Sequence, residues 1–161
     1  MSTDDWEHRV AALWADETIG DQQRIARMQD LATAAPHPAL AEFEVGSAFD
    51  SGGNEVEADV HYVAATTAGL STVDSNRAAQ MVVQHASTLR NLGRINEAIA
   101  MLRDAPAHPA TGAAPKVFLA LALHSAGRSD EALRVAIEAV EPTLPRYRRS
   151  VRAYAKALTD H

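Results

Sequence analysis

The chain has 161 residues, enough for one domain or a short array of repeats. Apolar residues make up 47% of it, too many for a disordered chain, and 33 alanines far outnumber the 8 aromatic residues. Valine and isoleucine together number only 17, which is poor material for a large sheet, whereas alanine is the best helix former. The absence of cysteine excludes disulfides, thiol nucleophiles and cysteine-based zinc sites.

The net charge of −6 hides a strong asymmetry along the chain. Residues 1–60 carry 13 acidic and 3 basic side chains, a net of −10, whereas residues 61–161 carry 8 acidic and 12 basic side chains, a net of +4. This asymmetry favours a charged partner or head-to-tail contacts, although solvated helix faces would explain it equally well. The acidic N-terminus and the lack of a bilayer-spanning apolar stretch predict a cytoplasmic protein without membrane contact.

The first 38 residues show helical periodicity in two segments. The first apolar stripe consists of Trp6, Val10, Leu13 and Trp14, and the second of Ile25, Met28, Leu31 and Ala32. Gly20-Asp21 separates the two segments, and Pro36-His37-Pro38 ends the second. We therefore predict an N-terminal helical hairpin over residues 1–38.

Beyond this hairpin the sequence repeats itself. Three segments align on Gly53, Gly93 and Gly127, with a small residue seven positions before the glycine, a bulky apolar residue four before it and an alanine five after it. The three columns are Gly46, Ala86 and Ala120; Phe49, Leu89 and Leu123; and Ala58, Ala98 and Ala132. The alanine column advances by 40 and then by 34 residues, so the first interval holds six additional residues, around 68–74.

These columns resemble those of the tetratricopeptide repeat, a 34-residue helix–turn–helix unit. The resemblance implies an all-α, right-handed α-solenoid of about nine helices, in which the small residues let paired helices touch and the turn glycine adopts a positive φ. The implied divisions are the hairpin over 1–38, three repeats over 39–144 (39–72, 79–112 and 113–144) and a C-terminal capping helix over 145–161. This order is similar to that of a small bacterial group of three-repeat proteins.

The resemblance also implies a binding surface, because the first helix of each repeat in this family lines a concave groove that holds a peptide. The corresponding positions here are Phe43, Ser47 and Asp50; Val83, Ser87, Arg90 and Asn91; and Val117, Leu121 and His124. Arg90 is the best single anchor, since its guanidinium can hold a carboxylate through two hydrogen bonds. Alternatively, Asp50 and Arg90 satisfy each other across the repeats. The basic clamp with which some members hold acidic chaperone tails is missing.

A last amphipathic helix is predicted near the C-terminus. Its apolar stripe, which would pack on the third repeat, consists of Leu144, Tyr147, Val151, Tyr154 and Leu158. A basic patch on its other face consists of Arg146, Arg148, Arg149, Arg152 and Lys156. Arginine interleaved with tyrosine suits nucleic acid, but the overall acidity argues against it and favours a solvated face or an acidic partner.

No pattern indicates catalysis, a cofactor or a metal. The chain lacks GxxxxGK[ST] and GxSxG motifs, and its seven histidines include no HExxH pair. We expect His85 to be hydrogen-bonded in or near the core and His124 to face the groove. The predicted function is a non-enzymatic scaffold or adaptor that binds a protein or peptide in its groove. The alternative function is binding of nucleic acid or an acidic partner through the C-terminal helix, and an enzyme or metal protein is the least favoured interpretation. A homodimer is also possible.

Overall fold

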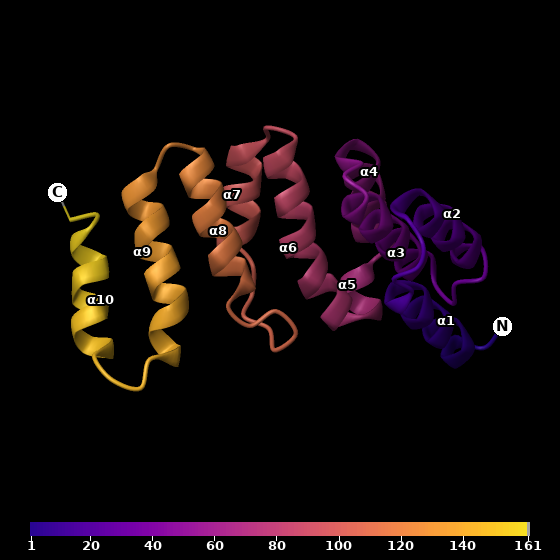
Figure 1. Cartoon of the computed structure of the whole chain (residues 1–161), viewed down its shortest axis with the longest axis horizontal. Coiled ribbons are helices and arrows are strands. Elements are labelled where there is room, and N and C mark those ends of the chain that lie inside the picture. Colours follow the sequence, from indigo (N-terminus) through magenta and orange to yellow (C-terminus); the bar gives the residue numbers. More distant parts are fainter. Residues whose placement is uncertain (161) are drawn as a thin grey trace.

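The computed structural model describes residues 1–160, and the chain is helical throughout this range (Figure 1). The elements are α1 (Thr3–Ala15), α2 (Asp21–Ala32), α3 (Pro38–Ser51), α4 (Glu55–Thr67), α5 (Leu70–Val73), α6 (Ser75–Asn91), α7 (Ile95–Arg103), α8 (Ala114–Ser125), α9 (Ser129–Val140), the 3₁₀ turn η1 (Glu141–Thr143) and α10 (Arg148–Ala157). The described residues contain no strand, so the predicted all-α solenoid is confirmed.

The helix count differs from the prediction by one short element. Ten α-helices are present in the described range where about nine were predicted, and the additional one is α5. It forms from the six extra residues between the first two repeats and buries Leu70. The predicted C-terminal helix extends to residue 161, which lies outside the described residues. None of the helices described is long and apolar enough to cross a membrane.

The aligned glycines make the turns within the helix pairs. Gly53, Gly93 and Gly127 have φ values of 72°, 80° and 74°, in the left-handed region that costs glycine little. In each turn, the N–H of the next residue donates to the carbonyl of the bulky residue four positions before the glycine, at 2.9, 2.8 and 2.9 Å. This six-to-one bond closes the first helix of the pair and reverses the chain. The glycine column is therefore fixed by backbone geometry.

The small columns allow paired helices to approach closely. Ala58, Ala86 and Ala98 are fully buried. Gly46, in α3, faces α4 so closely that an added Cβ would lie 3.0 Å from Cδ1 of Tyr62. The ring of Tyr62 is itself fully buried and has no room to retreat.

Gly46→Ala is therefore expected to lower the free energy of unfolding by about 1–3 kcal/mol through overpacking. The gain in helix propensity, about 0.5–1 kcal/mol, offsets only part of that cost. Urea denaturation followed by circular dichroism measures the difference. The control is Gly20→Ala, which has no atom within 4 Å of the added methyl group and should change the value by less than about 1 kcal/mol. Equal losses at both positions would contradict the close approach.

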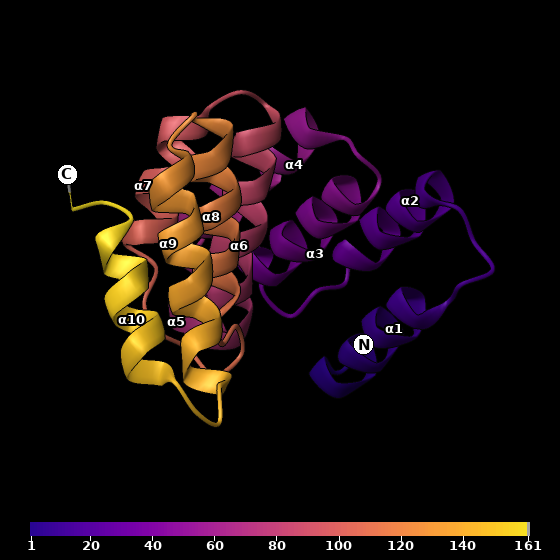
Figure 2. The ribbon, with the colours of Figure 1, turned by 60° about the vertical axis from the view of Figure 1, so that its left-hand side comes forward.

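Two apolar cores follow one another along the array. The first joins α1 to the start of α6 and includes Trp6, Met28, Phe43, Tyr62, Leu70 and Met81. The second joins the end of α6 to α9 and includes Leu89, Ala98, Leu102, Leu119 and Leu123. Figure 2 shows the helices of the second core stacked side by side, with α1, α2 and α3 as a separate group. Helix α6 belongs to both cores and connects the two groups.

The predicted apolar stripe of the last helix is wrong at both tyrosines. Tyr147 and Tyr154 are 76% and 74% exposed, and the residue that is buried instead is Ala155. The helix begins only at Arg148, because the chain first passes through η1 and a turn in which Tyr147 adopts a φ of 69°. Val151 and Ala155, one turn apart, face the array, whereas Tyr147 lies in the turn and Tyr154 lies about 100° round the helix from Ala155.

Candidate functional site

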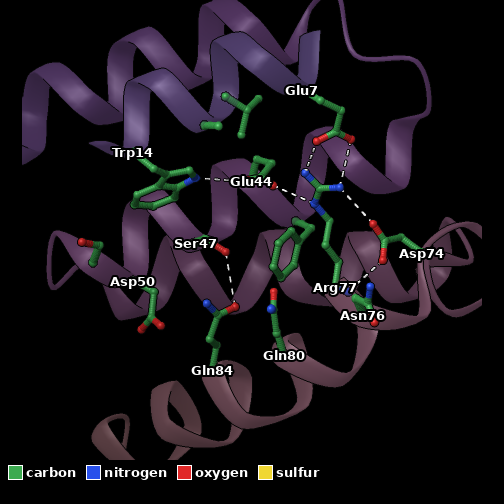
Figure 3. A pocket seen from close by; sticks show the side chains of 14 residues that line it. Glu7, Trp14, Glu44, Ser47, Asp50, Asp74, Asn76, Arg77, Gln80 and Gln84 are labelled. Atoms are coloured by element: carbon green, nitrogen blue, oxygen red, sulfur yellow. Dashed lines mark hydrogen bonds and ion pairs between the residues drawn. The ribbon is translucent and has the colours of Figure 1, made fainter. Parts of the chain in front are cut away.

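A hollow of about 680 Å³ opens between α1, α3 and α6, and we call it the N-terminal groove (Figure 3). Its lining residues are Glu7, Val10, Ala11 and Trp14 of α1; Phe43, Glu44, Ser47, Asp50 and Ser51 of α3; and Asp74, Asn76, Arg77, Gln80 and Gln84 at the start and along α6. The volume lies within the range of ligand pockets in proteins, about 300–1,000 Å³, and suits a few side chains of a bound segment.

Arg77 is the centre of an ion network in the wall of this groove (Figure 3). Its two terminal nitrogens donate to the carboxylate of Glu7 at 3.0 and 2.6 Å, and Nε donates to Oε1 of Glu44 at 2.8 Å. Nη1 also donates to Oδ2 of Asp74, which caps α6, at 2.9 Å. The other oxygen of Glu44 accepts from the indole of Trp14 at 2.8 Å. One guanidinium thereby ties together α1, α3 and α6.

The network leaves the groove negatively charged. Burial alone would lower the pKa of Arg77, but the hydrogen bonds that it donates to Glu7 and the negative charge of Glu44 outweigh burial and raise this pKa. Burial likewise works against ionisation of Asp74, yet the hydrogen bonds from Arg77 lower its pKa below the usual value. The lining contains four carboxylates and one guanidinium, a net of −3. The groove therefore favours a cationic ligand.

Asp50 lies at the end of the groove and is held by two hydroxyls. Its carboxylate accepts from Oγ1 of Thr88 at 2.9 Å and from the hydroxyl of Tyr62 at 3.3 Å. Burial raises the pKa of Asp50, and the two hydrogen bonds offset only part of this effect. The alternative in which Asp50 pairs with Arg90 is wrong, since Arg90 instead donates from Nε to Oγ of Ser125 at 2.9 Å.

The raised pKa of Asp50 predicts a pH-dependent stability difference. Because the pKa of Asp50 is higher in the folded than in the unfolded state, the residue stabilises the fold most at a pH below its unfolded-state pKa. This stabilisation is lost as the pH rises through its folded-state pKa. Asp50→Asn removes the dependence. Its melting temperature relative to the unaltered protein should therefore rise by a few degrees from about pH 3 to about pH 7, by differential scanning calorimetry. The control Ser51→Asn, beside Asp50 at an exposed position, alters no titratable group, so its difference in melting temperature should not change with pH. A constant difference for Asp50→Asn would contradict the assignment.

The structure distributes the residues predicted for the binding surface over two regions. Phe43, Ser47 and Asp50 line the N-terminal groove, and Oγ of Ser47 donates to Oε1 of Gln84 at 3.3 Å. The others lie outside this hollow: Val83 is buried, Ser87 and Arg90 are half-buried, and Asn91, Val117, Leu121 and His124 are exposed. The two terminal nitrogens of Arg90 have no partner among the described residues.

Two histidines, His61 and His85, each contact a single carboxylate. His85 is buried, as predicted, and its Nε2 lies 2.6 Å from Oδ1 of Asp59. His61 Nδ1 lies 2.7 Å from Oε2 of Glu42. Within residues 1–160, no three histidine or acidic side chains are grouped so that they could hold a metal ion. His161 lies outside the described residues.

Sequence reasoning missed Glu7, Trp14, Glu44 and Arg77. The family pattern assigns groove positions only within the repeats, so it could not show that α1 forms one wall. Arg77 lies between the first two aligned repeats, in a stretch for which the pattern makes no assignment. One signal was present, since the charged residue Glu44 lies directly between the apolar residues Phe43 and Val45 of α3. A buried carboxylate predicts a basic partner somewhere in the fold.

All five residues of the basic patch are exposed. Arg148 donates to the carbonyls of Leu144 and Pro142, and Arg152 donates to Oε1 of Glu141 at 2.9 Å. The other three, Arg146, Arg149 and Lys156, have no acidic partner in the part of the chain that is described. The patch therefore carries positive charge that is not neutralised within the chain.

Comparisons with known proteins agree with the helix pairs and turns. The profile of the family described as Tetratrico peptide repeat matches residues 39–158. The match covers α3 to α10 and leaves α1 and α2 outside it. No curated protein matches the chain, and no solved structure does so either.

Proposed function

Because the chain belongs to the tetratricopeptide repeat family, a protein-interaction fold that is typically non-catalytic, we propose that it is a scaffold that binds a peptide segment of a partner in the N-terminal groove. The observation that most supports this proposal is a row of carboxamides along α6. Asn76, Gln80 and Gln84 are spaced by four residues, on one face of the helix, and all three line the groove.

A carboxamide both donates and accepts hydrogen bonds, so a row of them matches the alternating N–H and C=O groups of an extended peptide backbone. Asn76 and Gln80 have no side-chain hydrogen bond within the described range, and Gln84 uses only its oxygen, which accepts from Ser47. Their amide groups are therefore available to a ligand. Val10 and Phe43 supply apolar surface in the same hollow.

The residues predicted along α6 and α8 would extend the peptide-binding surface beyond the N-terminal groove. Val117 and Leu121 are 44% and 43% exposed on α8, and Arg90 presents two unpartnered nitrogens. A peptide that leaves the N-terminal groove would meet this second region, where Arg90 can bind a carboxylate.

Gln80→Trp is expected to weaken peptide binding at least about tenfold, because the indole fills the groove from an exposed position without disturbing the core. Trp14 lies in the groove wall and reports on binding through its fluorescence. Unlabelled twelve-residue peptides of basic, acidic and apolar composition are therefore titrated while tryptophan emission is recorded. The control Val60→Trp places the same bulk on the outer face of α4, where Val60 is 62% exposed. Arg90→Ala in the same titration tests the second region.

The proposal fails if none of the peptide classes changes the emission of Trp14, or if Val60→Trp and Gln80→Trp weaken binding equally. Calorimetry of the unaltered chain with the same peptides detects binding independently of the emission of Trp14. Absence of the binding surface and absence of the reporter signal are thereby separated.

The C-terminal basic patch supports a second candidate function, binding of an acidic partner or of nucleic acid. The observation that favours it is the exposure of both Tyr147 and Tyr154 among the arginines, since exposed aromatic rings with cations suit stacked bases. Retention of a single-stranded oligonucleotide that falls steeply with salt is the expected signature.

A further inference from the structure

We propose that the occupant of the N-terminal groove is the basic face of helix α10 from a second copy of this chain, so that copies associate head to tail. This inference rests on the proposed function, because it requires the groove to bind a peptide segment. It goes beyond that function by naming the partner and the segment that docks.

The acceptor side is the net charge of −3 in the groove lining. The carboxylates of Glu7, Glu44 and Asp74 share a single guanidinium, so hydrogen bonding is satisfied while negative charge remains in excess. Asp50 adds a further carboxylate that contacts only hydroxyls. A cationic side chain entering the hollow would be attracted by all four acids and would meet one cation.

The donor side is the outward face of α10. Arg149, Ala153 and Lys156 follow one another at i, i+4 and i+7, so they form one stripe opposite the buried Ala155, and all three are exposed. The two cations of the stripe have no acidic partner among residues 1–160, and they stand about 10 Å apart along the helix axis. The small Ala153 between them lets the helix approach a surface closely.

The arrangement of the chain makes this contact intermolecular. Helices α1 and α10 lie at opposite ends of the elongated array, so α10 cannot reach the groove of its own chain (Figure 1). Docking one end on the other end of a second copy is a heterologous contact, and such contacts continue along a series of copies unless the rotation closes a ring. The mass of the assembly should therefore grow with protein concentration.

Charge complementarity favours a second copy over nucleic acid. Nucleic acid would neutralise the basic face but leave the acidic groove without a partner. The second copy neutralises both surfaces with one contact. Because the contact is electrostatic and lies at the surface, it should weaken as salt shortens the range of the charges.

The test is the mass of the full chain in solution by sedimentation velocity, at about 25 mM and about 500 mM salt. At low salt the weight-average mass should exceed the 17.3 kDa of one chain and rise with concentration, and at high salt it should return to one chain. Two variants each remove one surface. Ser51→Lys with Gln80→Lys places cations in the groove at exposed positions without side-chain partners, and Arg149→Glu with Lys156→Glu reverses the stripe on α10.

Each double variant alone should be at least about tenfold weaker in self-association. An equimolar mixture should form a dimer of twice the mass of one chain that does not grow further, because the mixture contains one intact groove and one intact α10. The charge-matched control, Arg9→Glu with Lys116→Glu, alters exposed cations outside both surfaces and should associate like the unaltered chain. A monomeric mixture, or an unaltered chain that is monomeric at low salt, overturns the proposal.

A second measurement separates this inference from the proposed function. A labelled peptide of residues 145–158 is titrated into the Arg149→Glu, Lys156→Glu variant, whose groove is intact, and binding is followed by fluorescence anisotropy. Binding that Ser51→Lys with Gln80→Lys abolishes supports the inference. If this peptide fails to bind while another peptide binds the groove, the inference is wrong and the proposed function stands. If α10 instead retains an oligo(dT) strand at physiological salt and the protein stays monomeric, α10 serves nucleic acid and the inference is overturned.

Discussion

Replacing Arg77 with methionine is expected to lower the free energy of unfolding by about 3–5 kcal/mol, because the substitution removes one partner of a buried ion pair and leaves the other charged. The side chain of Glu44 is only 5% exposed, and Arg77 supplies its only counter-charge among residues 1–160. Methionine keeps much of the length of arginine, so the loss reports on charge more than on volume. Unfolding in urea, followed by both circular dichroism and tryptophan emission, measures the change.

Arg94→Met is the matched control. Arg94 also binds two carboxylates, Asp59 at 2.7 Å and Glu97 through two hydrogen bonds, but its side chain is 42% exposed. Solvent and salt weaken such a surface network, so the expected loss is below about 1 kcal/mol. Glu44→Gln should restore part of the stability of Arg77→Met because it removes the unpaired charge. Equal losses in Arg77→Met and Arg94→Met, or no rescue, would show that Arg77 does not stabilise the docking of α1 on α3 and α6.

Trp6→Ala is expected to cost about 3–5 kcal/mol, the usual loss for a fully buried indole. Trp6 is 0% exposed, its Nε1 donates to the carbonyl of Leu31 at 3.0 Å, and the guanidinium of Arg77 lies 5.8 Å from its ring centre. The residue therefore joins α1 to α2 and to the ion network. The loss should be local to the first core, since each unit of a repeat array contacts only its neighbours.

Amide hydrogen exchange measures, segment by segment, where along the chain Trp6→Ala lowers protection. In Trp6→Ala, amides of α1 to α4 should lose protection, whereas amides of α8 and α9, in the second core, should keep theirs. Leu123→Ala is the converse control, because Leu123 is buried in the second core and should leave α1 and α2 protected. A uniform loss of protection in both variants would show that the two cores unfold as one unit.

The fold was predictable because its signals are local. The glycine column marks turns that require a positive φ, and the small columns mark positions where helices touch, so Gly53 or Ala58 can be interpreted from the sequence alone. The last helix was less predictable. Either Tyr154 or Ala155 could follow Val151 in the buried stripe, since i+3 and i+4 both share its face, and the structure buries Ala155. Tyr147 lies in a turn before the helix.

The site was only partly predictable because it joins elements that are distant in sequence. Phe43, Ser47 and Asp50, which were predicted from family positions on α3, line the hollow, and their role in binding stays a prediction. The contact between Glu7 and Arg77 spans 70 residues, and no pattern in the sequence relates the two. The charge asymmetry did indicate an acidic surface in the first 60 residues, but only the structure shows that part of it faces a groove.

The most direct test of α10 as the occupant of the groove is a ¹H–¹⁵N NMR titration of the full chain with the peptide of residues 145–158. Side-chain N–H groups report separately from the backbone, and the groove contains the indole of Trp14 and the carboxamides of Gln80 and Gln84. We expect these signals to shift while the indole N–H of the fully buried Trp6 stays in place. Shifts confined to the outer face of α4, around Val56 and Val60, or no shift at all, would contradict the account.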